Sequence, residues 1–157
     1  MRFRRATLGD LDEVLAIVAR TDTQAGDWAP QHDTAERDRE RVTELLAAEG
    51  NHNEAAEADG RVVGFASLEP RLGAAHLAYL FVDPSHQGQG IGAQLLERAM
   101  AEATRRGYAR ATLATAAGNH GARRFYERAG WKDTGGRRFH PDFGLEMADY
   151  ARDLDGP

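Results

Sequence analysis

The sequence predicts a single domain of the α/β or α+β class, and three observations support this prediction. The chain has 157 residues, of which 41% are hydrophobic and 29% charged, a balance typical of one globular core. Helix-like and strand-like patterns alternate along the chain, without repeats or linkers between them. Residues 76–116 have the pattern strand, helix, strand, which predicts two parallel strands joined by a right-handed crossover.

The first half of the chain contains two predicted helices and three predicted strands. Thr7 and Asp10 form a capping signal at the start of a helix, because an acid three residues after a threonine can bond back to its N–H. Asp59-Gly60 lies between two extended segments and predicts a two-residue hairpin turn. In order, the elements are a strand over 2–6, a helix over 11–20, a loop over 21–32, a helix over 34–48, and strands over 53–58 and 61–68.

The second half begins with the parallel unit and ends with a hairpin. Asp83-Pro84 ends the first strand, and Gly107 and Gly130 end two helices, since glycine readily adopts the left-handed conformation there. The elements are a strand over 76–82, a helix over 90–106, a strand over 109–116, a helix over 121–129, and a closing hairpin of 131–138 and 143–148.

Composition excludes several classes of function. The sequence has no cysteine, so disulfides, thiolate nucleophiles and cysteine-ligated metals are excluded. The net charge of −5 argues against nucleic acid as a partner, and no paired metal-ligand spacing such as H-E-x-x-H occurs. No apolar run has the roughly 18 residues of a membrane helix, and the N-terminus lacks a signal-peptide pattern. We therefore expect a cytoplasmic protein with no metal and no membrane contact.

A glycine-rich segment joins the strand over 76–82 to the following helix. Gly88, Gly90 and Gly92 can adopt positive φ and let a ligand approach the backbone closely. The first N–H groups of the helix have no intrahelical partner and lie at the positive end of its dipole. This arrangement predicts a phosphate site built from main-chain amides.

Two other phosphate loops and a turn without ligand are alternatives for this segment. G-x-G-x-x-A over 88–93 formally fits a dinucleotide fingerprint, but that motif belongs at the first strand of a doubly wound sheet. Residues 110–115 also lack the acid that would bind the ribose, and there is no Gly-Lys-Ser/Thr of a nucleoside triphosphate loop. A tight turn without ligand is the structural alternative, although one or two glycines would suffice for it.

Two motifs resemble those of the GNAT superfamily of N-acetyltransferases. Q-x-x-G-x-G over 87–92, just after Leu-Phe-Val-Asp-Pro, resembles the family's acyl-CoA pyrophosphate loop. N-x-x-A-x-x-F-Y-E-x-x-G-W over 119–131 resembles its second motif, with Trp where Phe is usual. The motifs occur in the family's order, one strand apart, and the order of the other elements also matches, least well over residues 20–58.

The resemblance implies both a fold and a reaction. The fold is a mixed, mostly antiparallel sheet of seven strands, with a splayed central parallel pair and helices on both faces. The reaction is transfer of an acetyl or other short acyl group from acetyl-CoA to a primary amine, by direct attack in a ternary complex. Without cysteine, a covalent relay through a thiol is disfavoured. Family members often dimerise, so the resemblance is compatible with a homodimer.

The resemblance also implies which residues hold acetyl-CoA. The pantetheine arm would enter between the parallel strands and bond to the backbone at Phe81 and Val82, where an N–H would polarise the thioester carbonyl. Asn119 would cap the last helix and contact the pantetheine arm. Arg123 and Arg124 would contact outer phosphates or adenine, or form a solvated helix face. The pyrophosphate would lie on the amides of Gln87, Gly88, Gln89, Gly90, Ile91, Gly92 and Ala93.

Tyr126 is the candidate general acid. Cleavage of the thioester leaves a thiolate, and a phenol with a pKa of about 10 beside the sulfur can donate the proton. The resemblance places Tyr126 at that position. The alternative is a core tyrosine, because Ala122, Phe125, Tyr126 and Ala129 form one apolar stripe.

The sequence does not single out the base that deprotonates the acceptor amine. Glu69 and His76 are candidates, and Tyr79 is a candidate contact to the substrate, whereas Asp83 is expected only to close its strand. Trp28 is a candidate aromatic wall for the acceptor, with a satellite core residue as the alternative. The charges conflict: Arg137, Arg138 and His140 favour an acidic acceptor, but Asp22, Asp27 and Asp33 favour a cationic one.

Two further hypotheses for the function stay open. The first is an acyl-CoA binding or sensing module on the same fold, without catalysis. The second is a different nucleotide-binding α/β protein, which would respond to NAD or ATP and not to CoA.

Overall fold

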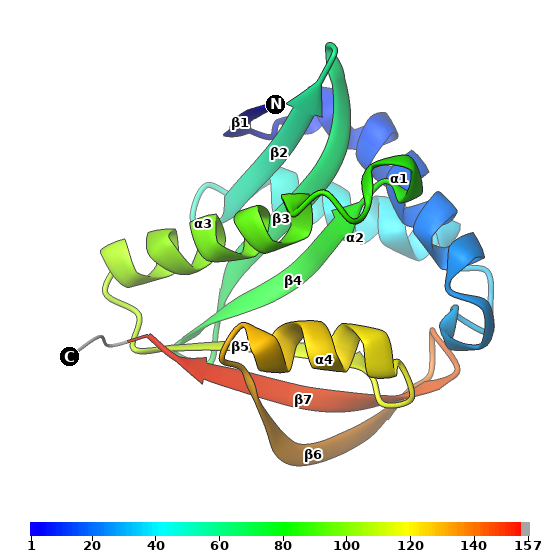
Figure 1. Cartoon of the computed structure of the whole chain (residues 1–157), viewed down its shortest axis with the longest axis vertical. Coiled ribbons are helices and arrows are strands. Elements are labelled where there is room, and N and C mark those ends of the chain that lie inside the picture. The colour runs from blue at the N-terminus through cyan, green and yellow to red at the C-terminus, as the bar shows by residue number, and fades with distance from the viewer. Residues whose placement is uncertain (155–157) are drawn as a thin grey trace.

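The computed structural model describes residues 1–154, which form seven strands and four α-helices in three layers (Figure 1). The helices are α1 (Leu11–Gln24), α2 (Ala35–Ala47), α3 (Ile91–Arg105) and α4 (His120–Arg128). The strands are β1 (Arg2–Arg5), β2 (His52–Ala58), β3 (Arg61–Arg71), β4 (Ala74–Val82), β5 (Arg110–Ala116), β6 (Lys132–His140) and β7 (Leu145–Asp153). None of these helices is long and apolar enough to cross a membrane.

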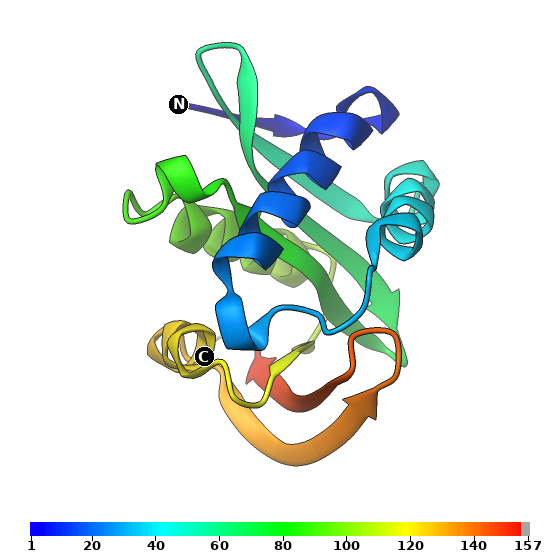
Figure 2. The same ribbon diagram turned by 90° about the vertical axis from the view of Figure 1, so that its right-hand side faces the viewer.

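One mixed sheet forms the middle layer. Its strands lie in the order β1-β2-β3-β4-β5-β7-β6, and every neighbouring pair is antiparallel except β4 and β5. Helices α1 and α2 cover one face of the sheet, and α3 and α4 cover the other (Figures 1 and 2). The predicted mixed sheet with a central parallel pair is therefore confirmed.

Apolar stripes on the helices hold the layers together. Val14 and Val18 of α1 and Val42 of α2 pack on one face of the sheet, against the buried Phe65. The cluster on the other face includes Leu77, Leu96, Met100, Leu113, Trp131 and Tyr150. Burial of each such large apolar side chain stabilises the fold by about 1.5–3 kcal/mol.

The helix and strand limits differ most from the predictions in three places. α1 continues four residues past the predicted end at Arg20, to Gln24. β3 extends to Arg71 and closes in a second tight turn at Leu72-Gly73, with φ of 51° and 81°. β7 runs to Asp153 instead of ending at residue 148. In β3 and β7 the additional residues are largely polar and half-exposed, and pairing with a neighbouring strand, rather than their own propensity, keeps them extended.

A bulge in β4 separates the two parallel strands. Ser67 of β3 pairs with Tyr79, but Leu68 pairs with Leu77, so Ala78 is an extra residue on β4. A bulge bends its strand and increases the local twist. The parallel pairing of β4 with β5 consists of residues 75 and 76 with 111 and 112, and it ends directly before this bulge. β4 and β5 therefore diverge toward their C-terminal ends, as the predicted splayed pair requires.

Gly64 in β3 allows close packing of the start of α3. A Cβ at this position would lie 2.9 Å from Leu95 Cδ1 and 3.2 Å from Ile91 Cγ2. We expect Gly64→Val to lower the free energy of unfolding by about 1–3 kcal/mol, because overpacking a close-packed core strains its side chains. Urea denaturation measures the change. Gly50→Val is the control, since a Cβ at Gly50 meets no atom within 4 Å; an equal loss in both variants would contradict this packing.

Candidate active site

Beyond the bulge, β4 has one main-chain edge without a strand partner. The amide of Asp83 donates to the carbonyl oxygen of Val63 in β3 at 2.8 Å, which sets the alternation of the antiparallel ladder. By that alternation, the N–H and C=O groups of Leu80 and Val82 point toward the gap left by β5, and those of Phe81 point toward β3. The register thus favours Leu80 and Val82, rather than Phe81, for main-chain contacts with a ligand in the gap.

The glycine loop presents a row of free main-chain amides. Gly88 and Gly90 have φ of +78° and +81°, and Gly90 directly precedes α3. Among the described residues, the N–H groups from Gly88 to Ala93 donate to no protein acceptor. The first that does is that of Gln94, which bonds the carbonyl of Gly90 at 3.0 Å. Consecutive free donors at the positive end of a long helix form a site for a phosphate or diphosphate.

Gln87 connects this loop to the open edge of β4. Its Nε2 donates to the carbonyl oxygen of Val82 at 3.1 Å. The side chain of Gln87 therefore satisfies the carbonyl oxygen of Val82. The N–H of Val82 stays available as a donor at that point of the edge.

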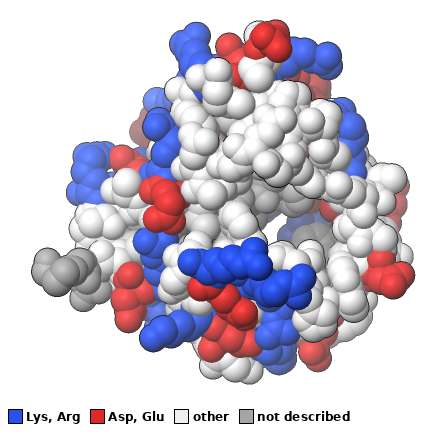
Figure 3. All heavy atoms as spheres, in the orientation of Figure 1, with Lys and Arg blue, Asp and Glu red and all other residues white. Residues whose placement is uncertain are grey.

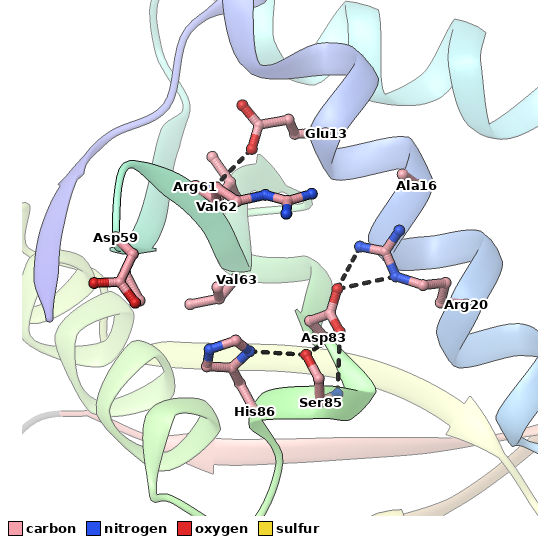
Figure 4. A pocket seen from close by; sticks show the side chains of 11 residues that line it. Glu13, Ala16, Arg20, Asp59, Arg61, Val62, Val63, Asp83, Ser85 and His86 are labelled. Carbon is pink, nitrogen blue, oxygen red and sulfur yellow. Dashed lines mark hydrogen bonds and ion pairs between the residues drawn. The ribbon is translucent and has the colours of Figure 1, made fainter.

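Asp83 fixes the start of the loop. Its buried carboxylate accepts from the N–H of Ser85 at 3.0 Å and from the hydroxyl of Ser85 at 2.8 Å. Arg20 of α1 donates to it through Nε at 2.9 Å and also through Nη2 (Figure 4). Burial alone would raise the pKa of Asp83, but the bonds from Ser85 and Arg20 outweigh burial and lower it. The end of α1 is thus tied to the segment that leads into the glycine loop.

An open hollow of about 630 Å³ lies beside this network, between α1, the β2–β3 turn and the short helix η3 (Pro84–His86). Its charged groups alternate in sign, with Glu13 and Asp83 near Arg20 and Arg61 (Figure 4). It shares no lining residue with the predicted acetyl-CoA site. We therefore assign the candidate site to the open edge of β4 and the glycine loop, and not to this hollow.

α4 carries two of the predicted site residues. Asn119 caps the helix, because its Oδ1 accepts from the N–H of Ala122 at 3.1 Å. The ring of Tyr126 lies edge-on to Phe125 and Trp131, with centroid distances of 5.2 and 6.0 Å. Desolvation by these neighbours raises the pKa of the Tyr126 phenol, so it is protonated at neutral pH, although part of its surface is exposed. Tyr126 is thus both packed and accessible.

Arg123 has a structural role that sequence reasoning missed. It donates at 2.8 Å to each of three groups, the Tyr150 hydroxyl, the Asp133 carboxylate and the Ala117 carbonyl. These bonds tie α4 to β6, β7 and the loop after β5, so Arg123 is neither a solvated side chain nor free for a phosphate. Arg124 is exposed.

Glu69 and His76, the two candidate bases, lie at the closed end of the gap. They face each other across β3 and β4, where β4 still pairs with Thr112 of β5. His76 Nδ1 lies 2.9 Å from the Thr112 hydroxyl, and Arg71 donates to Nε2 at 3.1 Å. Burial, together with the charges of Arg71 and Arg41, lowers the pKa of His76 to about 4. Glu69 accepts from Arg71 at 3.1 Å and from Arg41. Both candidates are bonded to other partners and lie level with the paired part of β4 and β5, which argues against either as the base.

Tyr79 anchors α2 to β4. Its buried hydroxyl donates to Asp38 Oδ1 at 2.8 Å, and Thr34 donates to the same carboxylate at 2.9 Å. Burial and the charge of Asp38 raise the pKa of Tyr79. The residue is therefore a support beneath the acceptor side and not an open contact surface.

The segment between α1 and α2 crosses the gap. Trp28, at the end of the short helix η2 (Gly26–Trp28), lies on Gly118 after β5, where a Cβ would overlap its ring. Trp28 is 41% exposed, so it is not a core residue. Further on, the N–H of Gln31 donates to the carbonyl of Phe143 in the β6–β7 turn at 2.6 Å (Figure 2). The surface is hollowed between the end of β4 and α4 (Figure 3).

The cationic residues on the acceptor side are engaged with neighbours. Arg137 pairs with Asp133 at 2.7 Å, and Arg138 pairs with Asp149 at 3.0 Å. The ring of His140 stacks on that of Phe143 at a centroid distance of 4.0 Å, and burial lowers the pKa of His140. These residues therefore offer little free positive charge to an acidic acceptor.

The acidic residues of the same region have three different environments. Asp33 accepts from the N–H of Ala35 at 3.0 Å, at the start of α2. Asp27 is exposed in η2, whereas Asp22, in the last turn of α1, is half-buried. Asp22 is thus the acid that the fold turns inward.

Comparison with known proteins agrees with this architecture. Residues 15–131 match the model of the acetyltransferase (GNAT) family, and the chain belongs to that family. An uncharacterized N-acetyltransferase of Archaeoglobus fulgidus is 34% identical over 134 residues, which are 80% of this chain and 89% of the relative. The ribosomal protein bS18-alanine N-acetyltransferase of Escherichia coli K12 is 36% identical over 80 residues, 51% of this chain and 54% of that protein.

A solved structure also shares the fold. The PaiA N-acetyltransferase of Thermoplasma acidophilum, crystallised in complex with coenzyme A, has a TM-score of 0.80 and 16% identity. The match covers 97% of this chain and 98% of that chain. This likeness extends over almost the whole chain and concerns the fold.

The contact between Trp28 and Gly118 is testable by fluorescence, because the sequence has two tryptophans and Trp131 is only 2% exposed. We expect Gly118→Ala to displace the Trp28 ring and to increase quenching by acrylamide, since the added Cβ would overlap the ring. Gly121→Ala is the control, because the nearest atom to a Cβ there is 3.7 Å away. Equal quenching of both variants would contradict the contact.

Proposed function

We propose that this protein transfers the acetyl group of acetyl-CoA to a primary amine, by direct attack within a ternary complex. The observation that carries the proposal is the row of free amides from Gly88 to Ala93, directly beside the unpaired main-chain edge of β4. Because the net charge of the chain is −5, a diphosphate needs local donors to bind. Backbone amides supply them without the entropy cost of ordering side chains. The same row supports coenzyme A over a ligand without phosphate.

Three residues of the chain have separate roles in the proposed reaction. Acetyl-CoA supplies an acetyl group already activated as a thioester. The N–H of Val82 donates to the thioester oxygen and stabilises the negative charge that develops there as the amine attacks. Tyr126, protonated at neutral pH, gives its proton to the sulfur as the carbon–sulfur bond breaks. Asn119 retains its side-chain amide as a donor for the pantetheine arm.

Two similarities support this assignment. The relatives are named N-acetyltransferases, and one neighbour in fold was crystallised with coenzyme A. The relative in Escherichia coli is named for the alanine of a ribosomal protein, so a peptide N-terminus belongs among the acceptors to test. Thiol release over a panel of amines distinguishes the two hypotheses: an acetyltransferase releases CoA with at least one amine, whereas a module that only senses acyl-CoA binds it and releases none. A thermal shift with NAD or ATP, and none with CoA, would contradict both.

Replacement of Gly90 tests the phosphate site. Gly90→Ala places a side chain at a φ of +81°, which strains the loop and turns its amides, so we expect at least a tenfold rise in the Kd for CoA. Gly107→Ala is the matched control, because Gly107 has a φ of +88° at the other end of α3. Isothermal titration with CoA measures both. A similar Kd in the two variants would place the diphosphate elsewhere.

Replacement of Tyr126 tests the general acid. Tyr126→Phe keeps the packing and removes the hydroxyl, so we expect kcat to fall about 10²–10⁴-fold while the Kd for acetyl-CoA stays within a few fold. Because burial raises the pKa of this phenol, the loss is expected to be constant between pH 6 and 9. Tyr108→Phe is the control. Unchanged turnover of Tyr126→Phe would remove Tyr126 as the acid.

A further inference from the structure

On two helices that cover the same face of the sheet, a carboxylate lies at one end of the apolar stripe. On α1, Val14 and Val18 are buried, and Asp22 follows one turn after Val18. On α2, Val42 is buried, and Asp38 precedes it by one turn. Residues four apart lie on one helix face, so both acids occupy positions that packing alone would give to apolar residues.

The two acids differ in their partners. Asp38 is 6% exposed and accepts hydrogen bonds from Tyr79, Thr34 and Arg37. Asp22 is half-buried, and among residues 1–154 no group forms a hydrogen bond or ion pair with its carboxylate. Burial, with the charge of Asp38, raises the pKa of Asp22 to about 6. A desolvated carboxylate without a partner destabilises a fold, which is typical of a group kept for function.

Two anchors place Asp22 beside the gap. Asp38 bonds Tyr79, which lies on β4 just after the bulge where β5 has diverged. The chain beyond Asp22 leads within a few residues to Trp28, which lies on Gly118 after β5. Asp22 is therefore between the divergent half of β4 and the segment that crosses the gap, on the opposite side of the sheet from α3 and α4.

The elements packed against this end of α1 contribute few other charges. β3 presents apolar side chains, and Arg20 and Asp83 pair with each other near the glycine loop. Arg37 is engaged by Asp38, Asp142 and His140. The charged group that acts on Asp22 is Asp38 of α2, whose carboxylate in turn bonds Arg37 and the hydroxyl of Tyr79 on β4.

We propose that Asp22 receives the ammonium group of the acceptor and takes its proton, so that the acceptors are amines that are cationic at neutral pH. The inference rests on the proposed acetyl transfer. An ammonium nitrogen loses two protons when it becomes an amide. One passes through Asp22 to solvent, and the other replaces the proton that Tyr126 gives to the sulfur. The nitrogen–carbon bond forms as the carbon–sulfur bond breaks, and the products are the amide, free CoA and one proton.

The kinetic test compares two amines of the same shape, ethylamine and 2,2,2-trifluoroethylamine. At pH 7.5 the first is a cation and the second is largely neutral, so only the first needs a base. We expect Asp22→Asn to lower kcat/KM for ethylamine about 10²-fold or more and that for trifluoroethylamine only a few fold, measured by thiol release. Asp59→Asn, which removes an exposed acid from the β2–β3 turn, is expected to change neither.

The outcomes separate this inference from the function on which it rests. An equal loss with both amines, or a loss with neither, would overturn the role of Asp22 and leave acetyl transfer intact. If the wild-type protein releases no thiol with any amine tested, the proposed function is overturned, and the inference with it.

Thermal unfolding gives a readout that does not depend on activity. The folded state binds a proton at Asp22 more tightly than the unfolded state does, since its pKa of about 6 lies above the 3.8 of an ordinary aspartate. The ionised group therefore destabilises the fold above pH 6, and this cost disappears as the pH falls toward 4. We expect Asp22→Asn to have a higher Tm than the wild type at pH 8 and an equal Tm at pH 4. A lower Tm at pH 8 would reveal a structural partner of Asp22 and contradict the proposal.

Discussion

The divergence of β4 from β5 is the constraint on which the rest of the site depends. In a continuous sheet, the N–H and C=O groups of Leu80 and Val82 would bond to β5 and be unavailable. The extra residue Ala78 bends β4 away instead, and the chain leaves those groups facing a gap. An unpaired central edge costs stability unless a ligand or water satisfies it. The sheet thus contains an incomplete position that an extended, hydrogen-bonding molecule completes.

The order of elements and the glycine loop could be predicted from the sequence, because both depend on local signals. Asp59-Gly60 and Gly90 adopt the positive φ that their residue types favour, and the helices follow their apolar periodicity. Strand ends and side-chain partners could not be predicted. His76 and Glu69 are attractive bases in the sequence, yet both bond arginines that are distant or on another element, and no local signal reveals such pairing.

The same limitation applies to the main chain of β4. Which backbone groups face the gap depends on the register with β3, and a shift by one residue exchanges Phe81 for its neighbours. The bulge at Ala78 sets that register, and it has no distinctive residue type. Arg123 is a similar case, because its three partners come from segments that only the folded sheet brings together. The motif identifies the region of the site, and tertiary contacts determine its individual atoms.

The last turns of α1 link the two halves of the site. Arg20 bonds Asp83 at the entrance of the glycine loop, and Asp22, two residues later, faces α2 on the other side of the helix. One turn of α1 therefore acts both on the segment that leads into the glycine loop and on α2. By thermodynamic reciprocity, any displacement of this turn by one substrate changes the affinity for the other by the same factor in both directions. In the proposed acetyl transfer, coupling between the affinities for the two substrates is consequently a property of this helix end, and not of either recess alone.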